Sequence, residues 1–204
     1  MFTGIVQGVA EVVSVVRQPG LHSFGLRLPE RWRHNLAVGG SVAVNGTCLT
    51  ITREEHGLVW FDAMQQTLSL TNLGSVSEGD FVNFERAARI GDEIGGHLMS
   101  GHIHTVATLI QRDEPENNCV LWFEIEAQWQ QYIFSKGYIG INGCSLTLAE
   151  VEDNRFCIWL IPETLRATTF GAMVPGTQVN IEIDSQTQTI VDTLKRLGYD
   201  KPPR

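Results

Sequence analysis

Asn45-Gly46-Thr47-Cys48-Leu49-Thr50 returns 97 residues later as Asn142-Gly143-Cys144-Ser145-Leu146-Thr147. Asn-Gly is the strongest short-range hairpin signal, so each copy predicts a tight turn that leads into a strand. Three more pairs of blocks have the same spacing without a gap: 3–6 with 100–103, 67–74 with 164–171, and 79–85 with 176–182. Two copies are too few for a solenoid, which stacks several shorter repeats. The sequence therefore predicts a tandem duplication of one compact domain, which can form two similar sites.

Each half contains about six short β-rich runs, separated by Gly, Pro or polar pairs. The expected strands are 9–16, 22–28, 41–44, 49–52, 58–61 and 81–85, then 105–111, 120–126, 138–141, 146–151, 156–160 and 178–183. Short helical turns are expected after Pro29 and Gln65 and at their counterparts. Closing such a sheet removes its exposed edges. We therefore predict an all-β protein with two tandem, homologous, six-stranded β-barrels.

The repeat divides the chain into a first domain over residues 1–96, a second over 97–184, and a C-terminal helix and tail over 185–204. Gly95-Gly96 gives conformational latitude to the joint between the halves. Ser185 is expected to cap the helix and Gly198 to end it. Its apolar stripe consists of Ile190, Val191, Leu194 and Leu197. Either its own barrel or copies from other subunits must cover this stripe.

Composition restricts the partners. The formal net charge of −8 disfavours a nucleic-acid backbone or an anionic membrane surface. The N-terminus has no signal-peptide pattern, and no run approaches the length of a membrane span. The four cysteines show no CxxC spacing and are too few for a disulfide framework. Reduced thiols in a cytoplasmic protein are the simplest interpretation.

Cys48 and Thr50 point to one side of their strand, because side chains alternate along a strand. A thiol and a hydroxyl presented together can hydrogen-bond a heteroaromatic ligand. The alternative is that Cys48 is a small buried hydrophobe, as most free cysteines are. Ser145 and Thr147 at the equivalent positions favour the ligand hypothesis, since a core would more often have aliphatic side chains there.

The stretch from Gly95 to His102 combines glycine pairs with two histidines, and His104 follows. A zinc site is disfavoured, because there is no HExxH motif and no acidic ligand at helical spacing. The glycines instead predict close approach of the backbone to a ligand or another chain. His102 stands where the first copy has Ile5, which suggests unequal use of two sites or a partly buried structural histidine. No GxGxxG, P-loop or GxSxG motif supports a nucleotide or esterase function.

With these motifs, the chain resembles the α-type riboflavin synthase family. The resemblance spans about residues 1–195 and is carried by residues 1–6, 45–50, 92–102, 136–147, 162–165, 168–169 and 180–184. It implies two Greek-key barrels, with a C-terminal helix that organises a homotrimer. It also implies that two molecules of 6,7-dimethyl-8-ribityllumazine exchange a four-carbon unit, giving riboflavin and a ribitylaminopyrimidine. No metal or redox cofactor is implied.

The resemblance further implies that the active site forms between the first barrel of one subunit and the second barrel of another. First-barrel contacts to the lumazine would come from Gly4, Ile5, Val6, Cys48, Leu49, Thr50, Asp62, Ala63, Met64, Gln65, Gln66 and Thr67. Second-barrel contacts would come from Gly101, His102, Ile103, Lys136, Ser145, Leu146, Thr147, Leu160, Ile161, Pro162, Glu163, Thr164 and Leu165. The residues expected to assist proton transfer or nucleophile addition are Ser41, Cys48, His102 and Asp184.

Two positions depart from the family pattern. Gln66 stands where many members have Glu, and Thr47 where some have a second Cys. An amide still donates and accepts hydrogen bonds, so Gln66 weakens contacts to a ribityl chain without removing them. Glu163 has an alternative role as a first-turn acid of a helix. The competing functional hypotheses are a non-catalytic lumazine or flavin carrier, like the antenna proteins of luminous bacteria, and an assembly module.

Overall fold

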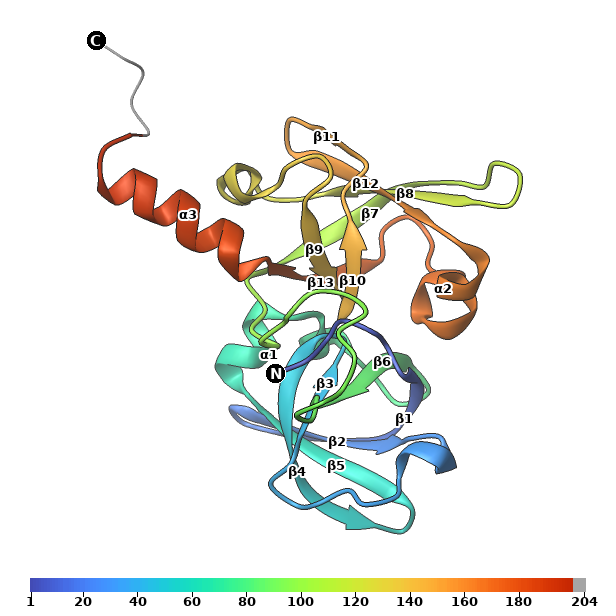
Figure 1. Ribbon diagram of the computed structural model, residues 1–204. Coiled ribbons are helices and arrows are strands. Elements are labelled where there is room, and N and C mark those ends of the chain that lie inside the picture. The colour runs from blue at the N-terminus through green and yellow to red at the C-terminus, as the bar shows by residue number, and fades with distance from the viewer. Residues whose placement is uncertain (200–204) are drawn as a thin grey trace.

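The computed structural model describes residues 1–199 and contains two β-domains with a helix extending from the second (Figure 1). The strands of the first domain are β1 (Gly8–Gln18), β2 (Leu21–Arg27), β3 (Ser41–Val44), β4 (Thr47–Glu55), β5 (Leu58–Met64) and β6 (Phe81–Arg86). They close into a barrel in the order β1-β2-β5-β4-β3-β6. Between them lie the short helical segments η1 (Glu30–Trp32), α1 (Gln65–Leu70) and η2 (Asn72–Ser75).

The second domain repeats this layout and ends in the long helix. Its strands are β7 (Thr105–Asp113), β8 (Cys119–Glu124), β9 (Tyr138–Ile141), β10 (Cys144–Thr147), β11 (Glu150–Glu152), β12 (Arg155–Leu160) and β13 (Gln178–Ile183). Its helical segments are η3 (Ala127–Tyr132), α2 (Pro162–Ala167), η4 (Thr169–Ala172) and α3 (Ser185–Arg196). The expected strands and helical turns are present, except that the single strand expected over 146–151 is divided into β10 and β11.

The two domains differ where the first has one long strand. In β4 a bulge between Ile51 and Arg53 bends the strand without breaking it. At the equivalent place in the second domain the chain is divided into β10 and β11, which form the two ends of a seven-stranded sheet. Only Leu148 and Ala149 separate them, and the Ala149 N–H still donates to the Cys157 carbonyl at 3.0 Å. The chain therefore continues along the wall of the second barrel, but the regular hydrogen bonding between strands is interrupted there.

Each domain has its own aromatic core. Phe24, Phe61 and Phe84 are almost fully buried in the first barrel, as the alternation of apolar residues along β2, β5 and β6 predicts. Phe123 and Phe156 lie in the second core, with ring centroids 5.6 Å apart. The burial of each core within one repeat is the pattern of a duplicated domain rather than of one domain split across the sequence.

Four asparagines join the barrels about a pseudo-twofold axis. The Asn83 side-chain N–H donates to the Asn142 carbonyl at 3.0 Å, and the Asn180 side-chain N–H donates to the Asn45 carbonyl at 2.9 Å. The side-chain oxygens of Asn45 and Asn142 accept the backbone N–H groups of Asn83 and Asn180. All four residues are buried, so these bonds satisfy backbone groups that water cannot reach.

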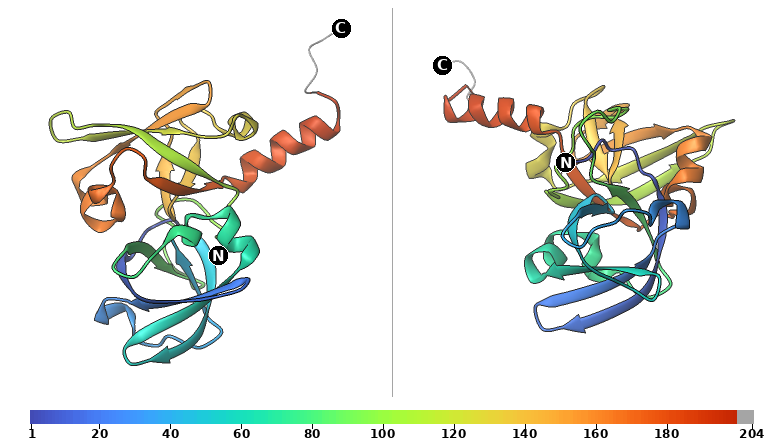
Figure 2. Two further views of the ribbon diagram at one scale, coloured as in Figure 1. Left: turned by 180° about the vertical axis from the view of Figure 1, so that it is seen from behind. Right: turned by 60° about the horizontal axis from the view of Figure 1, so that its bottom comes forward.

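The Asn-Gly turns themselves meet at this axis. Gly46 and Gly143 both have φ +80°, and a Cβ on either one would lie less than 3 Å from the other's backbone nitrogen. The repeated motif therefore forms a close contact between the barrels as well as a turn within each of them. Views from other directions show the two barrels stacked end to end across this junction (Figure 2).

The helix α3 points away from both barrels (Figures 1 and 2). It ends as expected, since Gly198 has φ +79° and its N–H donates to the Lys195 carbonyl. The expected N-cap is wrong by one residue: the Asp184 carboxylate, not Ser185, accepts the Thr187 N–H at 2.8 Å. Asp is a favoured N-cap, because its charge complements the helix dipole.

Candidate functional site

The N-terminal segment of the first domain lies against the second barrel. The Gly4 carbonyl accepts the Ser145 backbone N–H at 2.8 Å. Gly4 has φ +74°, and a Cβ there would lie 2.5 Å from the Ser145 Cβ. Two residues later, Val6 packs against the core of the second barrel. The first-copy block at 4–6 therefore meets the second-copy block at 145–147.

The second copy of this segment makes the reciprocal contact. The Gly101 carbonyl accepts the Cys48 backbone N–H at 2.9 Å, and a Cβ on Gly101 would lie 2.6 Å from the Cys48 Cβ. Gly101 has φ +80°, which a glycine adopts at little cost. The repeat alone groups each segment with the strand block of its own half. The structure instead brings together Gly4 with Ser145 and Gly101 with Cys48.

Ser145 has a second partner that the sequence analysis did not select. The Ser145 hydroxyl lies 2.6 Å from Nδ1 of His97, whose ring stacks on Tyr138 with centroids 5.1 Å apart. Burial lowers the pKa of His97, although the nearby Asp184 carboxylate opposes this shift. A neutral imidazole accepts a proton from a hydroxyl more readily than an imidazolium does. The glycine-rich stretch containing His97 was the available sequence signal, but nothing in it points to Ser145.

At the first barrel the equivalent hydroxyls and thiol lie on two paired strands. Ser41 on β3 is directly opposite Thr50 on β4, and Ala43 is opposite Cys48. Ser41 and Cys48 are partly exposed and Thr50 is exposed, whereas Leu49 between them is buried. Cys48 is therefore not the fully buried hydrophobe of the alternative interpretation. Three of the predicted polar groups share one surface of the barrel.

The predicted rim residues surround the starts of α1 and α2. Asp62 lies on β5 and accepts the Ser23 hydroxyl at 2.6 Å, while the next residues lead into α1. Glu163 lies in the first turn of α2 and forms an ion pair with Arg166 at 2.6 Å, which supports a first-turn role. Ala63 and Leu160 are buried, so that only part of each predicted block faces outward. The exposed residues of the two blocks are Asp62, Met64, Gln65, Gln66, Ile161, Pro162 and Glu163.

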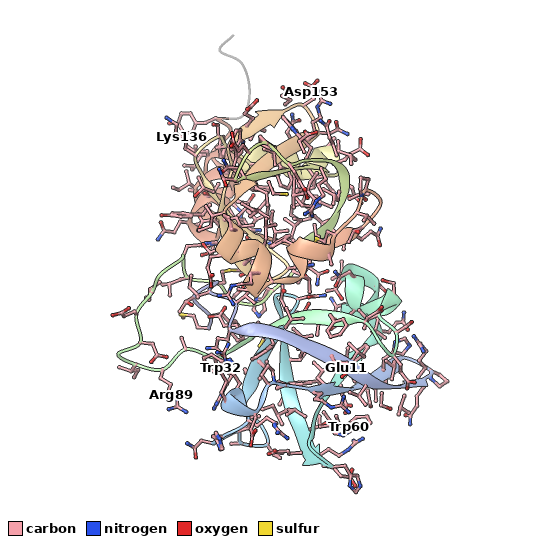
Figure 3. The ribbon with its side chains drawn as sticks, turned by 90° about the vertical axis from the view of Figure 1, so that its right-hand side faces the viewer. Glu11, Trp32, Trp60, Arg89, Lys136 and Asp153 are labelled. Carbon is pink, nitrogen blue, oxygen red and sulfur yellow. The ribbon has the colours of Figure 1, made fainter. Side chains whose placement is uncertain are left out.

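The remaining predicted residues lie on different segments of the second half of the chain. His102 is exposed, and its N–H donates to the Ser100 hydroxyl at 3.1 Å. Lys136 is exposed with φ +66° and lies toward the outer end of the second barrel (Figure 3). Asp184 is engaged as the cap of α3 and is close enough to His97 to affect its charge. Within residues 1–199, no group of three or more His, Cys, Asp or Glu side chains is placed to hold a metal ion.

A groove of about 1070 Å³ connects the first-copy segment with α2. Ile5, Val6 and Glu163 line it, together with Trp32 of η1 and Gly95 of the linker. Residues predicted for opposite barrels therefore share one recess. This is independent support for a ligand site that both halves of the chain form.

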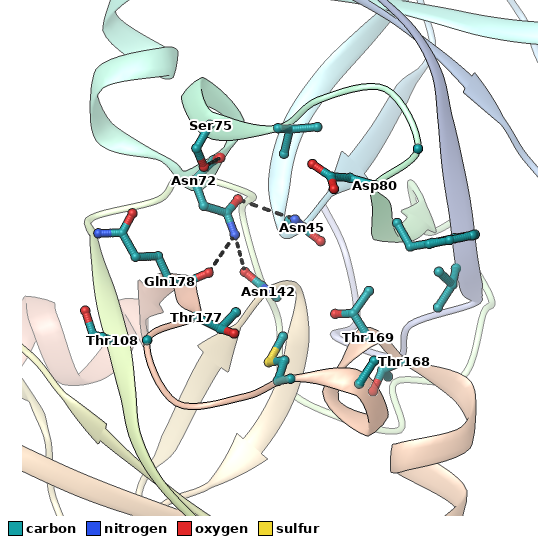
Figure 4. Close-up of a pocket in the computed structure, with 17 residues that line it drawn as sticks. Asn45, Asn72, Ser75, Asp80, Thr108, Asn142, Thr168, Thr169, Thr177 and Gln178 are labelled. Carbon is teal, nitrogen blue, oxygen red and sulfur yellow. Dashed lines mark hydrogen bonds between the residues drawn. The ribbon is translucent and has the colours of Figure 1, made fainter.

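A second cavity, of about 820 Å³, lies between the barrels and is lined by the asparagine junction (Figure 4). Asn72 spans it: its side-chain N–H₂ donates to the Asn142 side chain at 3.2 Å and to the Gln178 carbonyl at 3.1 Å. Its counterpart Thr169 is too short for this bridge, and its buried hydroxyl has no hydrogen-bond partner in the described structure. None of the predicted ligand residues lines this cavity.

Comparison with known proteins shows the class to which this duplicated barrel belongs. The family model of the lumazine binding domain matches the chain twice, at residues 3–87 and 100–184. Riboflavin synthase from Escherichia coli (strain K12) is 52% identical over 97% of this chain and 93% of its own. Riboflavin synthase from Chlamydia pneumoniae is 42% identical over 97% of this chain and 96% of its own. The chain belongs to the riboflavin synthase family.

Solved structures agree with this membership. LumP complexed with riboflavin superposes with a TM-score of 0.86 at 28% identity, over 91% of this chain and all of LumP. LumP complexed with 6,7-dimethyl-8-(1'-D-ribityl) lumazine gives a TM-score of 0.83 at the same identity. The same duplicated fold thus holds a lumazine or a flavin in another protein.

Proposed function

We propose that this chain is a riboflavin synthase: it converts two molecules of 6,7-dimethyl-8-ribityllumazine into riboflavin and 5-amino-6-(D-ribitylamino)uracil. One lumazine gives up a four-carbon unit and the other receives it, so that no oxidant or reductant is consumed. The observation that carries the proposal is the identity of 52% to a riboflavin synthase over nearly the whole chain. The match includes both repeats, as a reaction between two like substrates requires.

The crossed contacts suit this reaction, because it needs two identical molecules held in different roles. Bringing both substrates into one arrangement replaces an encounter in solution with an intramolecular step. We assign the residues at 48–50 and 101–103 to one lumazine and those at 4–6 and 145–147 to the other. This pairing follows the hydrogen bonds of Gly101 with Cys48 and of Gly4 with Ser145.

The chemical groups near these blocks can move protons and add to a ring. Ser41, Cys48, His102 and Asp184 are the proposed participants from the family resemblance. To them we add the pair of Ser145 and His97, whose 2.6 Å contact can pass a proton. Lys136 and the rim residues 62–67 and 160–165 are proposed to contact the ring or the ribityl chain.

We propose further that α3 assembles the chain into a homotrimer. The helix contacts its own domain through polar groups: Tyr132 donates to Asp192, and His104 lies 3.1 Å from Gln188. Its apolar side chains face outward, with Ile190 61% and Leu197 66% exposed. Because exposed apolar stripes of this kind are typical of interfaces, copies of α3 are the proposed cover. In such an assembly, one subunit's first barrel faces another's second barrel.

The domain division at residue 96, the C-terminal unit from 185 and a cytoplasmic location remain proposals. The location is supported by the free thiols of Cys48, Cys119, Cys144 and Cys157. Burial raises the pKa of Cys144 to about 12, as expected of an inert core thiol. Residues 200–204 lie outside the described residues. Among residues 1–199, no helix is long and apolar enough to cross a membrane.

The test is incubation of the purified full chain, treated with a chelator, with 6,7-dimethyl-8-ribityllumazine alone. Riboflavin is expected to appear, with one molecule formed for every two lumazines consumed. Stoichiometric binding of the lumazine without turnover would indicate a carrier instead. His102→Gln is expected to lower kcat at least tenfold. The control is His56→Gln, since His56 is an exposed histidine on the β4–β5 turn, away from all the blocks.

A further inference from the structure

Two buried glutamates occupy equivalent positions in the barrels and are not among the proposed ligand contacts. Glu85 lies on β6 and Glu182 on β13, with 3% and 4% of their surfaces exposed. Charged side chains are almost never this buried unless they are paired. The partners that the structure gives these carboxylates are N–H and hydroxyl donors of the backbone segments at 3–4 and 100–101.

The Glu85 carboxylate holds the start of the chain. It accepts the Thr3 N–H at 2.7 Å, the Thr3 hydroxyl at 2.8 Å and the Gly4 N–H at 3.0 Å. The successive N–H groups of Thr3 and of the left-handed Gly4 form a concave anion site, and the Glu85 carboxylate fills it. Because Gly4 is free to adopt many conformations, its carbonyl direction depends on this anchor.

The Glu182 carboxylate holds the second copy in the same way. It accepts the Ser100 N–H at 2.6 Å, the Ser100 hydroxyl at 2.8 Å and the Gly101 N–H at 3.0 Å. The bound segment continues directly into the exposed His102. Burial raises the pKa of both glutamates, while the bonds from the two segments oppose the rise. Only the ionised form can accept every donor that surrounds it.

The segment held by each barrel completes the candidate site of the other one. Glu85 belongs to the first barrel, but Gly4 bonds to Ser145 of the second. Glu182 belongs to the second barrel, but Gly101 bonds to Cys48 of the first. A change at one glutamate must therefore be felt across the junction, at the opposite ligand block.

We propose that Glu85 and Glu182 are positioning residues that act crosswise: Glu85 orders the ligand site of the second barrel, and Glu182 orders that of the first. The inference rests on the proposed function, since it assumes that these blocks bind lumazine or riboflavin. Each carboxylate is turned toward the backbone donors of the segment that it holds, and Glu85 also lines the groove of about 1070 Å³. Each acts through the glycine carbonyl and through Ile5 or His102 on the segment that it holds.

The test replaces each glutamate by glutamine in the full chain and measures riboflavin binding at each barrel separately. Gln keeps one acceptor oxygen but turns an amide N–H₂ toward backbone donors, so the segment loses part of its anchor. Riboflavin is titrated into labelled protein while the backbone amide NMR signals of Thr50 and Thr147 are followed. Thr50 reports on the first barrel and Thr147 on the second.

For Glu182→Gln, we expect the response of Thr50 to need at least tenfold more riboflavin, while that of Thr147 stays within twofold of the unsubstituted chain. Glu85→Gln should give the reverse pattern. The matched control is Glu78→Gln, because Glu78 accepts the Val15 N–H at 2.9 Å but lies on the exposed side of the first barrel. It should change neither response.

Milder variants keep the test decisive if a glutamine variant does not fold. Ser100→Ala removes the hydroxyl bonded to Glu182 and should weaken binding at Thr50. Ser100→Thr, which copies Thr3, should restore it. An equal loss at both barrels, or a loss confined to the glutamate's own barrel, would overturn the crosswise role. If the unsubstituted chain shows no riboflavin response at either threonine, the proposed function fails rather than this inference.

Discussion

The two barrels keep the same scaffold residues but differ in the side chains that face the candidate sites. Their asparagines, turn glycines and buried glutamates match position by position. The exposed positions do not, since Ile5 corresponds to His102, Ser41 to Tyr138 and Cys48 to Ser145. The junction therefore tolerates little change, because Gly46 meets Gly143 and the side chains of Asn83 and Asn180 bond across it to Asn142 and Asn45. The positions that we propose to face the ligand differ between the barrels, as separate donor and acceptor sites for one substrate would require.

The chain after each barrel differs even more. Beyond β6 it becomes a linker, which returns to the N-terminus where the Ala88 N–H donates to the Met1 carbonyl at 3.0 Å. Beyond β13, at the equivalent place, it becomes α3. The linker also brings His97 to Ser145, with 2.6 Å between the imidazole Nδ1 and the hydroxyl. Among residues 1–199, no histidine makes the corresponding hydrogen bond to the Cys48 side chain of the other site.

The largest effect is expected from separating the halves. Residues 1–97 alone should fold and bind riboflavin, because the first barrel closes on itself. Alone, however, Gly4 lacks Ser145, and Cys48 lacks Gly101. A second copy can supply both partners, so we expect a dimer by sedimentation, with turnover below about one-hundredth of that of the full chain. A monomer that binds riboflavin normally would show that the crossed contact is dispensable.

Within residues 1–199, the helix α3 follows the second barrel and has no equivalent after the first. Disrupting the subunit interface proposed for this helix should have the next largest effect on activity. Leu194→Asp places a charge in the exposed stripe of α3, where each covered Leu or Ile contributes about 1.5–3 kcal/mol. We expect dissociation at micromolar concentration and at least a tenfold loss of activity. Thr189→Asp is the control, because it adds the same charge outside the stripe. A trimer that survives Leu194→Asp would rule out this role of α3.

Substitution of Gly46 tests how much its contact with Gly143 contributes to the stability of the junction between the barrels. Gly46→Ala should reduce the free energy of unfolding by about 3 kcal/mol or more, since the new Cβ would lie 2.6 Å from backbone of the other barrel. Gly79 also has positive φ but nothing within 4 Å, so Gly79→Ala should cost only about 1 kcal/mol. Chemical denaturation measures both. Equal losses of stability in the two variants would mean that the close approach of Gly46 to Gly143 does not add to the cost of the substitution.

The strands, turns and terminal helix could be predicted from the sequence, because each depends on local periodicity or turn chemistry. The crossed pairing could not, since a repeat shows which blocks are equivalent but not which barrel each segment covers. The roles of Glu85 and Glu182 were hidden for the same reason: 82 residues separate Glu85 from Thr3 in the chain. The cap of α3 was misplaced because Asp184 and Ser185 are both good capping residues.

A smaller effect is expected at Asn72 and Thr169, which occupy equivalent positions at the junction but are different residues. Asn72→Ala leaves buried partners of its amide unpaired and should cost about 1–3 kcal/mol. Thr169→Asn installs the same amide on the other side, where a hydroxyl now lacks a partner. We expect a gain of about 1 kcal/mol, measured by thermal unfolding. Destabilisation by Thr169→Asn would mean that the cavity cannot hold the second bridge.

The smallest effect concerns pH and His97, which is present at only one of the two sites. Burial lowers the folded-state pKa of His97, so folding disfavours its protonated form. Its contribution to stability is therefore complete above the unfolded value and is lost as the pH falls through the lowered folded value. Between about pH 7.5 and about pH 5, His97→Gln should remove part of the acid destabilisation, by no more than about 1.4 kcal/mol per pH unit.

Denaturant unfolding at each pH provides the measurement, with His56→Gln as the exposed control. The Asp184 carboxylate opposes the shift and limits its size. Parallel loss of stability in the unsubstituted chain and in His97→Gln would exclude His97 as the responsible group. A difference between them, with none for His56→Gln, would show that the second barrel's hydroxyl faces a neutral imidazole at neutral pH. Within the described residues 1–199, no imidazole is hydrogen-bonded to the Cys48 thiol of the first barrel, so acid should then weaken ligand binding at Thr147 before it weakens binding at Thr50.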